Sequence, residues 1–542
     1  MNIQRSIDLS RWSLEEKIGQ LFICGFHSLV PDQGIVTLIR DYHVGGIVYF
    51  RRNIQSVEQL ATLSQDLQSV SRSHPEVPLF ISIDQEGGMV ARLDHEGLSR
   101  IPGNMTLGAA FDPGLTEEAA VLAAQEMKML GINLNFAPCV DINNNPANPV
   151  IGVRSFGENP QLVAEHGAAA IQGYQKSGIA ATAKHFPGHG DTAVDSHLGL
   201  AVVPHGVERL TQVELVPFKR AIEEDVDCIM TAHVIFPAFE QDDIPATISK
   251  KVLKDLLRHE MNYQGVIITD CLEMHAISQS VGVSEGAVRA LEAGADIVLV
   301  SHTLEEQTAA IKAVCEAVQS GRLSEERINE SVSRVFRLKD KRISYTQAVE
   351  PLPIPLIREE VSGELIRRIT ERSITLVRDQ GNIPLQAGKP ILVIWPELRH
   401  RTEVDEPSVH TYTLKDALQN YFDHVSEYVL GSHPTTSEIS EAIKLSMNFE
   451  QVVVITYTSE GSTPSGQIEL VEALYRIHGD EIVVASTRNP YDINHFHQIG
   501  TYICLYENRP YSLDALAKVL AGKMKPTGRL PVSLNPENRA EN

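Results

Sequence analysis

The segment KHFPGHGDTAVDSH, residues 184–197, concentrates side chains that can carry protons. Pro187 and the glycines at 188 and 190 exclude a helix, so we expect a loop here. Asp195 and His197 stand two residues apart, which places both side chains on one side of an extended chain. The carboxylate can then hold one ring nitrogen while the other nitrogen gives or takes a proton. This pair suits general acid–base catalysis near neutral pH.

Two other interpretations of residues 184–197 stay open. Clusters of His and Asp bind zinc, but this segment has neither an HExxH nor a CxxC spacing, and we expect no metal. A solvated loop with purely structural histidines is the second alternative. The segment directly continues the apolar run AATAKH, which favours a role at the end of a buried strand.

Asp270 ends the apolar run GVIITD and precedes CLEMHAI, which is expected to begin a helix. One interpretation is that Asp270 caps this helix. A carboxylate at the end of a strand is also well placed to be a nucleophile, opposite a proton donor. Glu273, three residues further on, is expected to serve the dipole of the helix that begins there.

Two further segments offer groups for binding. In DQEGGMVAR, the glycine pair lets the backbone approach a site closely, and Asp84 can accept hydrogen bonds from two neighbouring sugar hydroxyls. Arg92 in this segment and Arg154 in VRSFG can act as donors. The alternative for each is an Arg–Asp pair that only closes a surface loop.

Eight apolar runs alternate with amphipathic segments over the first 340 residues. Continuous apolar runs of this kind indicate parallel strands buried on both faces, and eight βαβ units predict a (β/α)8 TIM-type barrel. An open doubly wound sheet is the alternative. The expected strands are LFICG (21–25), GGIVYF (45–50), LFISID (79–84), NLNFAPCVD (133–141), AATAKH (180–185), CIMTAH (228–233), VIITD (266–270) and IVLVS (297–301).

Most of these runs end in a residue capable of chemistry, and in a barrel those ends meet at one mouth. They are Asp84, Asp141, Lys184 with His185, His233 and Asp270. Helix capping alone does not explain so many from different strands, so the pattern is typical of an enzyme.

The pattern of apolar and polar residues changes after residue 340. Residues 341–358 are rich in proline and lack periodicity, as expected of a linker. A second, smaller alternation over 359–542 predicts an α/β sandwich domain with strands at 391–395, 451–457, 481–486 and 501–506. We therefore expect a barrel domain over 1–340 followed by this second domain.

The overall composition limits the classes of molecule that the protein is expected to bind. A net charge of −23 makes a surface that repels nucleic acid and anionic lipid, so a small neutral or cationic molecule is the expected partner. Six cysteines stand singly without a CxxC pair, which is typical of a reducing compartment. The amino terminus lacks an apolar signal core, and no apolar run is long enough to span a membrane. We expect a cytoplasmic protein; the sequence indicates no oligomeric state.

Several motifs together resemble glycoside hydrolase family 3, over nearly the whole chain. The barrel motifs are WSLEEKIGQLF (12–22), DQEGG-x-V-x-R (84–92), RSFG (154–157), KHFPGHG-x4-DSH (184–197) and ITD-x-L-x-M-x-AI (268–277). SITLVRDQGNIPL (373–385) and PTGRLPVS (526–533) resemble signatures of the second domain of that family.

The DSH element resembles the β-N-acetylglucosaminidase branch of that family. This resemblance implies a retaining mechanism in which Asp270 attacks the anomeric carbon and His197, oriented by Asp195, is the acid/base. It implies exo-acting release of GlcNAc from chitin oligosaccharides or cell-wall (muropeptide) fragments, without a cofactor. The residues it implies for binding the terminal sugar are Asp84, Arg92, Arg154, Lys184, His185, Met230 and His233.

Two alternatives to hydrolysis stay open. A phosphorylase of the same branch is one, because a histidine acid/base avoids a second anion beside incoming phosphate. A non-catalytic sugar-binding barrel is the other. The presence of both Asp270 and the Asp195–His197 pair disfavours it, since a binding protein has no use for a separated nucleophile and acid.

Overall fold

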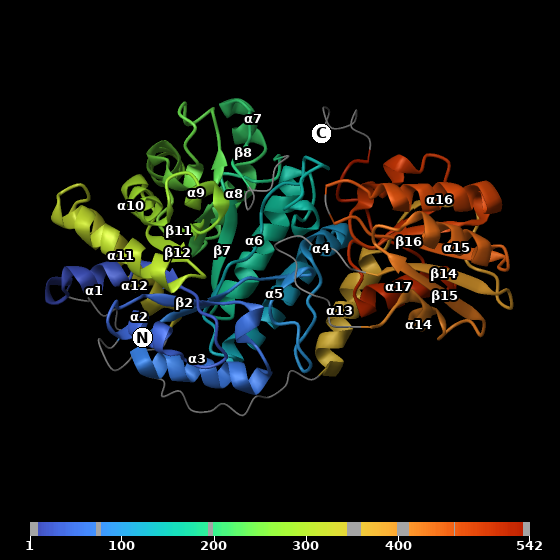
Figure 1. The fold of residues 1–542 in the computed structure, drawn as a ribbon, viewed down its shortest axis with the longest axis horizontal. Coiled ribbons are helices and arrows are strands. Elements are labelled where there is room, and N and C mark those ends of the chain that lie inside the picture. The colour runs from blue at the N-terminus through green and yellow to red at the C-terminus, as the bar shows by residue number, and fades with distance from the viewer. Residues whose placement is uncertain are drawn as a thin grey trace.

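The computed structural model describes residues 9–71, 77–192, 199–343, 359–397, 411–459 and 461–534 of the 542-residue chain. The first part is a closed barrel of eight parallel strands in the order β1-β12-β11-β9-β7-β6-β3-β2. The barrel and the second sheet lie side by side along the long axis of the molecule (Figure 1). All eight predicted apolar runs contribute a strand, so the predicted barrel is confirmed. The strands are β1 (Phe22–Cys24), β2 (Gly46–Tyr49), β3 (Phe80–Ile83), β6 (Leu134–Asn135), β7 (Ala180–Phe186), β9 (Cys228–Thr231), β11 (Val266–Cys271) and β12 (Ile297–Val300).

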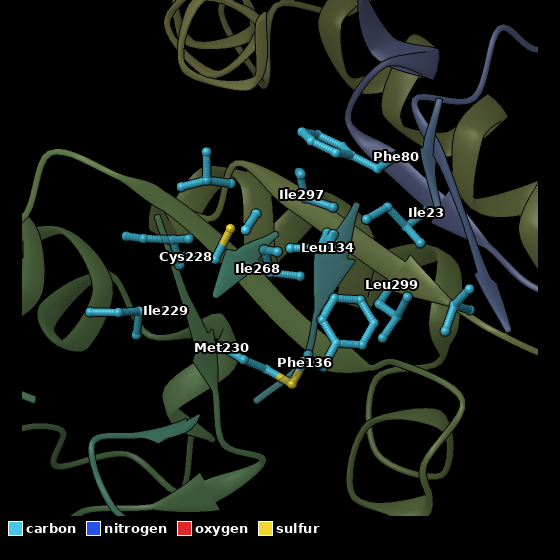
Figure 2. Close-up of a cluster of buried hydrophobic side chains, with 14 of the residues drawn as sticks. Ile23, Phe80, Leu134, Phe136, Cys228, Ile229, Met230, Ile268, Ile297 and Leu299 are labelled. Carbon is cyan, nitrogen blue, oxygen red and sulfur yellow. The ribbon is translucent and has the colours of Figure 1, made fainter. Parts of the chain in front are cut away.

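Apolar side chains from different strands fill the inside of the barrel. Phe80, Leu134 and Ile297 belong to one buried cluster that continues towards Phe136 and Leu299 (Figure 2). Nearly every residue of the eight strands is buried, because helices cover the outer face while this cluster fills the inner one. The barrel is therefore a packed core, and its binding surface has to lie at an end.

Helices surround the barrel, and their boundaries follow from capping residues. Asn159 accepts backbone hydrogen bonds from Gln161 and Leu162 at the start of α6, where Pro160 takes the first helical position. The main surrounding helices are α2 (Gln33–Arg40), α3 (Val57–Ser71), α5 (Pro113–Met129), α6 (Pro160–Lys176), α8 (Val216–Glu223), Lys251–Glu260, α10 (Val283–Ala293), α11 (Leu304–Gln319) and α12 (Glu325–Arg342).

Short elements complete the two ends of the barrel. They include the helices α1 (Leu14–Gly19), α4 (Asn104–Ala110), α7 (Val207–Gln212) and α9 (His275–Ser278). Two small sheets pair β4 (Gln85–Gly87) with β5 (Val90–Ala91) and β8 (Ala201–Val202) with β10 (Val234–Ile235). The β4–β5 hairpin directly follows barrel strand β3, so it lies at the end where the strands finish.

The second part is a six-stranded sheet in the order β13-β18-β17-β16-β14-β15, with only β13 antiparallel to its neighbour. Its four predicted runs are confirmed as strands, whereas β13 and β15 were not predicted. β15 is an edge strand with several exposed side chains, so it lacks a continuous apolar run. The elements are β13 (Thr375–Arg378), β14 (Ile391–Glu397), β15 (Val425–Gly431), β16 (Gln451–Thr456), β17 (Val483–Ser486), β18 (Thr501–Cys504), α13 (Glu359–Ser373), α14 (Leu414–Leu418), α15 (Thr436–Ser446), α16 (Ser465–His478) and α17 (Pro510–Leu520).

Helix α13 joins the two parts, because it packs against α4 and α5 of the barrel and against α17 of the second sheet. Most of the predicted linker, 344–358, lies outside the described residues, and the boundary at 359 stays a prediction. Among the described helices, none has both the length and the apolar composition needed to cross a bilayer.

Candidate active site

A cavity of about 600 Å³ opens at the carboxyl ends of the barrel strands, a volume typical of small-molecule sites. Seven of the sequence-predicted site residues line it together. They are Asp84, Arg92, Arg154, Lys184, His185, Met230 and Asp270. These residues come from five different strands or the loops after them, as expected of a barrel mouth.

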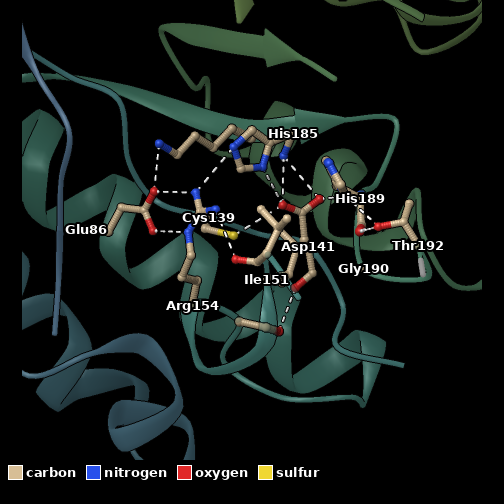
Figure 3. A network of polar contacts seen from close by, with 12 residues as sticks. Glu86, Cys139, Asp141, Ile151, Arg154, His185, His189, Gly190 and Thr192 are labelled. Atoms are coloured by element: carbon tan, nitrogen blue, oxygen red, sulfur yellow. Dashed lines mark hydrogen bonds and ion pairs between the residues drawn. The ribbon is translucent and has the colours of Figure 1, made fainter. Parts of the chain in front are cut away.

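Glu86 is the centre of a buried ion cluster in the wall of this cavity. The Lys184 Nζ atom lies 2.7 Å from both Asp84 Oδ1 and Glu86 Oε1. Arg154 donates to both Glu86 oxygens, at 3.0 and 2.8 Å (Figure 3). Burial opposes ionisation of Glu86, but the two cations outweigh it and hold the pKa of that carboxyl well below its usual range. Burial likewise opposes protonation of Lys184, yet Asp84 and Glu86 raise its pKa.

His185 is fixed by Asp141, which lies behind it. The ring Nδ1 lies 2.6 Å from Asp141 Oδ2, and the backbone N–H groups of His185 and His189 also donate to this carboxylate. Although burial alone would raise it, the pKa of Asp141 falls to about 2, chiefly because of His185. With Nδ1 directed at Asp141, the His185 Nε2 atom lies 3.4 Å from Arg154 Nη2 (Figure 3), and His185 lines the cavity.

His189 is buried beside this pair. Burial lowers its pKa to about 4, against the attraction of Asp141, so the ring is neutral at neutral pH. Its Nδ1 atom lies 3.0 Å from the Thr192 hydroxyl oxygen. His189 therefore lines the cavity as a neutral group.

Irregular strand pairing positions two of the site segments. Ile268 pairs with Ile297 and Cys271 with Leu299, so β11 has one residue more than β12 between these pairs and contains a bulge that includes Asp270. The same mismatch occurs between β7 and β9 at Lys184 and His185. Bulges of this kind redirect side chains, and here both of them place polar residues at the cavity.

Asp270 lies half-buried in the cavity wall, and the backbone N–H of Cys271 donates to its Oδ1 at 2.7 Å. His233 does not belong to the cavity lining. Its buried ring contacts the Cys271 carbonyl oxygen at 2.9 Å and the Thr247 hydroxyl at 2.8 Å. His233 therefore lies behind the strand end that carries Asp270, where it supports the backbone.

Glu273 differs from its sequence prediction. Its carboxylate accepts the backbone N–H groups of Ser301, His302 and Thr303, at 2.6–2.9 Å. These groups belong to the turn between β12 and α11, just before the first helical residue, Leu304, so Glu273 fixes this turn. Glu273 also precedes the first turn of α9, so the predicted role at the dipole of that helix was wrong.

Sequence reasoning missed a cationic part of the cavity wall. Phe50, Arg51 and Arg52 follow β2 directly and line the cavity. The Arg52 guanidinium lies 4.2 Å from the Phe50 ring centre and donates to the carbonyl oxygens of Phe26 and Ser301. Arg92 lies over the same ring, at 5.8 Å. The available signal was their position after the run GGIVYF, the same strand-end position that marked Asp84 and Asp270.

Asp195 and His197 lie outside the described residues, which leave out 193–198. The residues before them are well fixed. Asn148 Nδ2 donates to the carbonyl oxygens of His189 and Gly190, at 2.9 Å each. The proposed acid/base pair therefore follows a segment that is anchored at the cavity.

Two clusters of the described residues could each offer three ligands to a metal ion. In Cys139, Asp141 and His185, the central carboxylate already accepts the His185 ring and two backbone N–H groups. In Cys271, Glu273 and His302, the Glu273 carboxylate already accepts three backbone N–H groups. Hydrogen bonds within the chain thus account for both arrangements without a metal.

Comparisons with known proteins agree with this architecture. The glycosyl hydrolase family 3 N terminal domain matches residues 13–338, and the family 3 C-terminal domain matches 374–541. Beta-hexosaminidase A of Pseudoalteromonas piscicida is 31% identical over 92% of this chain and 90% of its own length. A family 3 beta-N-acetylglucosaminidase structure from Paenibacillus sp. str. FPU-7 is 49% identical, covers 97% of this chain and 99% of its own, and superposes with a TM-score of 0.93. A beta-glucoside phosphorylase structure, at 24% identity, 97% and 95% coverage and a TM-score of 0.82, shares the fold.

Proposed function

Because this chain belongs to glycosyl hydrolase family 3, we propose that it is a β-N-acetylhexosaminidase that hydrolytically releases GlcNAc from non-reducing ends of β-linked oligosaccharides. The observation that carries this function is one cavity shared by Asp270 and the Asp84–Lys184–Glu86–Arg154 ion cluster. A polar cluster of this kind binds a neutral, hydroxyl-rich ring, and a carboxylate beside it can attack that ring.

The proposed mechanism is retaining. The Asp270 carboxylate forms a bond to the anomeric carbon as the glycosidic C–O bond breaks, and the leaving oxygen takes a proton from His197. Water then gives a proton back to His197 and replaces Asp270 at the anomeric carbon, which restores both residues. Asp195 orients the His197 ring. The two members of this pair are assigned from the DSH motif alone.

The ion cluster supplies the binding groups. Asp84 retains 19% of its side-chain exposure and can accept sugar hydroxyls, whereas Lys184 and Glu86 are almost fully buried. Arg154, Lys184 and His185 direct donors or a ring nitrogen at the sugar, Arg92 adds a further donor, and Met230 offers an apolar surface. Ion pairing holds these side chains in one geometry before the sugar arrives, which lowers the entropy cost of binding.

The natural substrate and the cellular compartment are further parts of this proposal. We propose that chitin oligosaccharides or muropeptide fragments are the natural substrates and that the enzyme works in the cytoplasm. All six cysteines are free thiols and five of them are buried, as expected in a reducing compartment. Relative rates on GlcNAc dimer and on a GlcNAc–anhydromuramic disaccharide distinguish the two substrate classes.

Phosphorolysis is the second candidate reaction, and one observation favours it. Arg51, Arg52 and Arg92 line one side of the cavity in a protein whose net charge is −23. Such a local excess of cations suits an anionic acceptor such as phosphate.

Product analysis separates the two reactions. The purified chain is incubated with GlcNAc dimer in the presence and absence of phosphate, and the products are identified by mass spectrometry. We expect free GlcNAc under both conditions. If GlcNAc-1-phosphate is the main product when phosphate is present, the reaction is phosphorolysis. If neither GlcNAc dimer nor the GlcNAc–anhydromuramic disaccharide gives any product, the proposed function is contradicted.

A further inference from the structure

The second domain contacts the barrel directly behind the ion cluster. Glu86 lies in β4, and the hairpin turn at Gly87 and Gly88 that follows it packs against residues 101–103. A side chain at Gly88 would lie 2.6 Å from the Gly103 Cα atom, and the Gly88 N–H donates to the Ile101 carbonyl at 2.9 Å. The hairpin turn at Gly87 and Gly88 therefore packs closely against residues 101–103, with no room for a side chain at Gly88.

Two residues of the second domain hold these two segments. Arg509, at the start of α17, donates to the Gly88 carbonyl oxygen and lies 3.3 Å from Asp94 Oδ2. Glu507 accepts the Gly103 N–H at 2.9 Å, and Ser512 donates to its other oxygen. The Arg509 side chain is 13% exposed and that of its partner Asp94 is 3% exposed, so these contacts are largely shielded from water.

The positions of Glu86 and Arg154 both depend on the two segments that Arg509 and Glu507 contact. Glu86 is two residues from Gly88. On the other side, the Asn104 amide, next to Gly103, donates to the Arg154 carbonyl oxygen at 2.6 Å. Val153, beside Arg154, belongs to the apolar cluster of the second domain together with Met105 of α4. Movement of the second domain would therefore shift both sides of the ion pair.

Through Asp94, Arg509 is also linked to Arg51, another residue of the cavity lining. Asp94, its ion-pair partner, accepts Arg100 at 3.0 Å through its other carboxylate oxygen. The Asp94 backbone carbonyl accepts Arg51 of the cavity wall at 3.4 Å. One guanidinium thus contacts the segments behind two different walls of the site.

We propose that Arg509 is a positioning residue of the active site: through the Gly88 carbonyl it sets the place of Glu86, and through Glu86 that of Arg154 and Lys184. The second domain thereby contributes to sugar binding without touching the sugar through this residue. This inference rests on the proposed function, because it assigns the ion cluster to binding the terminal GlcNAc.

A double-mutant cycle tests this role. Wild type, Glu86→Gln, Arg509→Ala and the double variant are compared on p-nitrophenyl N-acetyl-β-D-glucosaminide. We expect Arg509→Ala to lower kcat/KM about tenfold or more, mainly by raising KM, since small displacements of binding groups are costly. In the Glu86→Gln background the same change should cost less than about twofold, because residues that act through each other are not additive. Full additivity would overturn the proposal.

Two further variants separate positioning from general loss of structure. Arg368→Ala removes an exposed contact of α13 with Glu118 on the barrel, far from the cavity lining, and should leave KM unchanged. Arg509→Lys keeps the charge and should restore part of the activity; if Arg509→Ala does not fold, Arg509→Lys replaces it in the cycle. An Arg368→Ala effect on KM equal to that of Arg509→Ala would also overturn the proposal.

Hydrogen exchange tests the same contact without any substrate. Backbone amides of residues 85–91 should exchange faster in Arg509→Ala than in wild type, with no such change in Arg368→Ala. Unchanged exchange there would overturn the positioning role. A wild type that neither hydrolyses the substrate nor binds GlcNAc would instead contradict the proposed function, and the exchange result would still decide whether Arg509 holds the hairpin.

Discussion

The two ends of the barrel both bury charged residues, and the cavity described above lies at the end where the strands finish. At the end where the strands begin, Asp296 lies before β12 and is fully buried. Its carboxylate accepts Arg258, Arg334 and Ser331, and the Ile267 N–H donates to it at 3.0 Å. At the end where the strands finish, Glu86 is buried in a similar network of cations, yet Asp84 and Asp270 beside it face the cavity.

Because buried ion clusters occur at both ends of the barrel, ion pairing by itself does not identify a functional site. Both carboxylate oxygens of Asp296 accept hydrogen bonds from other parts of the chain, so we infer a structural role for this cluster. The Glu86 cluster instead borders the cavity, and we propose that it holds groups in place for the sugar. Barrel enzymes generally carry catalysis at this second end and stability at the first.

Replacement of Asp270 by Asn should have the largest effect. A loss of kcat on the order of 10⁴-fold is expected, because the amide cannot form the glycosyl-enzyme. The thermal midpoint should change little, since Asp270 is half-buried and not part of the ion cluster. Steady-state kinetics on the aryl substrate check this, with exposed Asp225→Asn as the matched control. Turnover near the wild-type rate would remove Asp270 from the nucleophile role.

At the opposite end, Asp296→Asn should reduce stability and leave the active site intact. Removal of one partner from a buried ion cluster costs about 3–5 kcal/mol, here because the Arg258, Arg327 and Arg334 side chains would lose their shared anion. Denaturant unfolding measures this loss, and exposed Asp255→Asn is the control. Unchanged stability together with lost activity would reverse the assignment of the two ends.

Glu86→Gln should have an intermediate effect on activity, together with the loss of stability expected when a buried ion cluster loses its anion. We expect kcat/KM to fall about a hundredfold because Arg154 and Lys184 lose their common anion and their fixed positions. Most of this loss should appear in KM, as measured by saturation kinetics. Exposed Glu96→Gln, in the same stretch of chain, should behave as wild type.

The last prediction concerns the pH dependence of stability at Lys339, a fully buried lysine near Gln20 and Phe80 at the stability end. Burial lowers its pKa to about 7. The ordinary lysine value is near 10.4, so from pH 7 to pH 10 the unfolded chain binds a proton that the folded chain lacks. Stability should rise with pH over this window by about 1.4 kcal/mol per pH unit from this residue.

Lys339→Met should abolish this slope and be most stabilising relative to wild type below pH 7. Chemical unfolding at several pH values, compared between the two proteins, provides the measurement. Parallel pH profiles would mean that Lys339 is not held in an apolar environment.

The sequence predicted the architecture well because the strand runs are apolar and the helices amphipathic. It also predicted seven residues that gather at the mouth, since strand ends converge in any barrel, whereas His233 lies behind the lining. Glu86 was missed, although it lies two residues beyond Asp84, because nothing local shows that a carboxylate will be buried between two cations. The bulges at Asp270 and at Lys184 depend on pairing with neighbouring strands, and the contacts of Arg509 depend on how the domains pack. Such features arise only in the tertiary structure.

Labelling of the nucleophile tests the central claim most directly. A 5-fluoro glycosyl fluoride of GlcNAc forms a slowly hydrolysed glycosyl-enzyme with retaining enzymes, and digestion followed by mass spectrometry locates the modified residue. We predict one sugar per chain on the peptide that contains Asp270, blocked by excess GlcNAc. A label on another carboxylate, or an active enzyme that accumulates no label, would contradict the account.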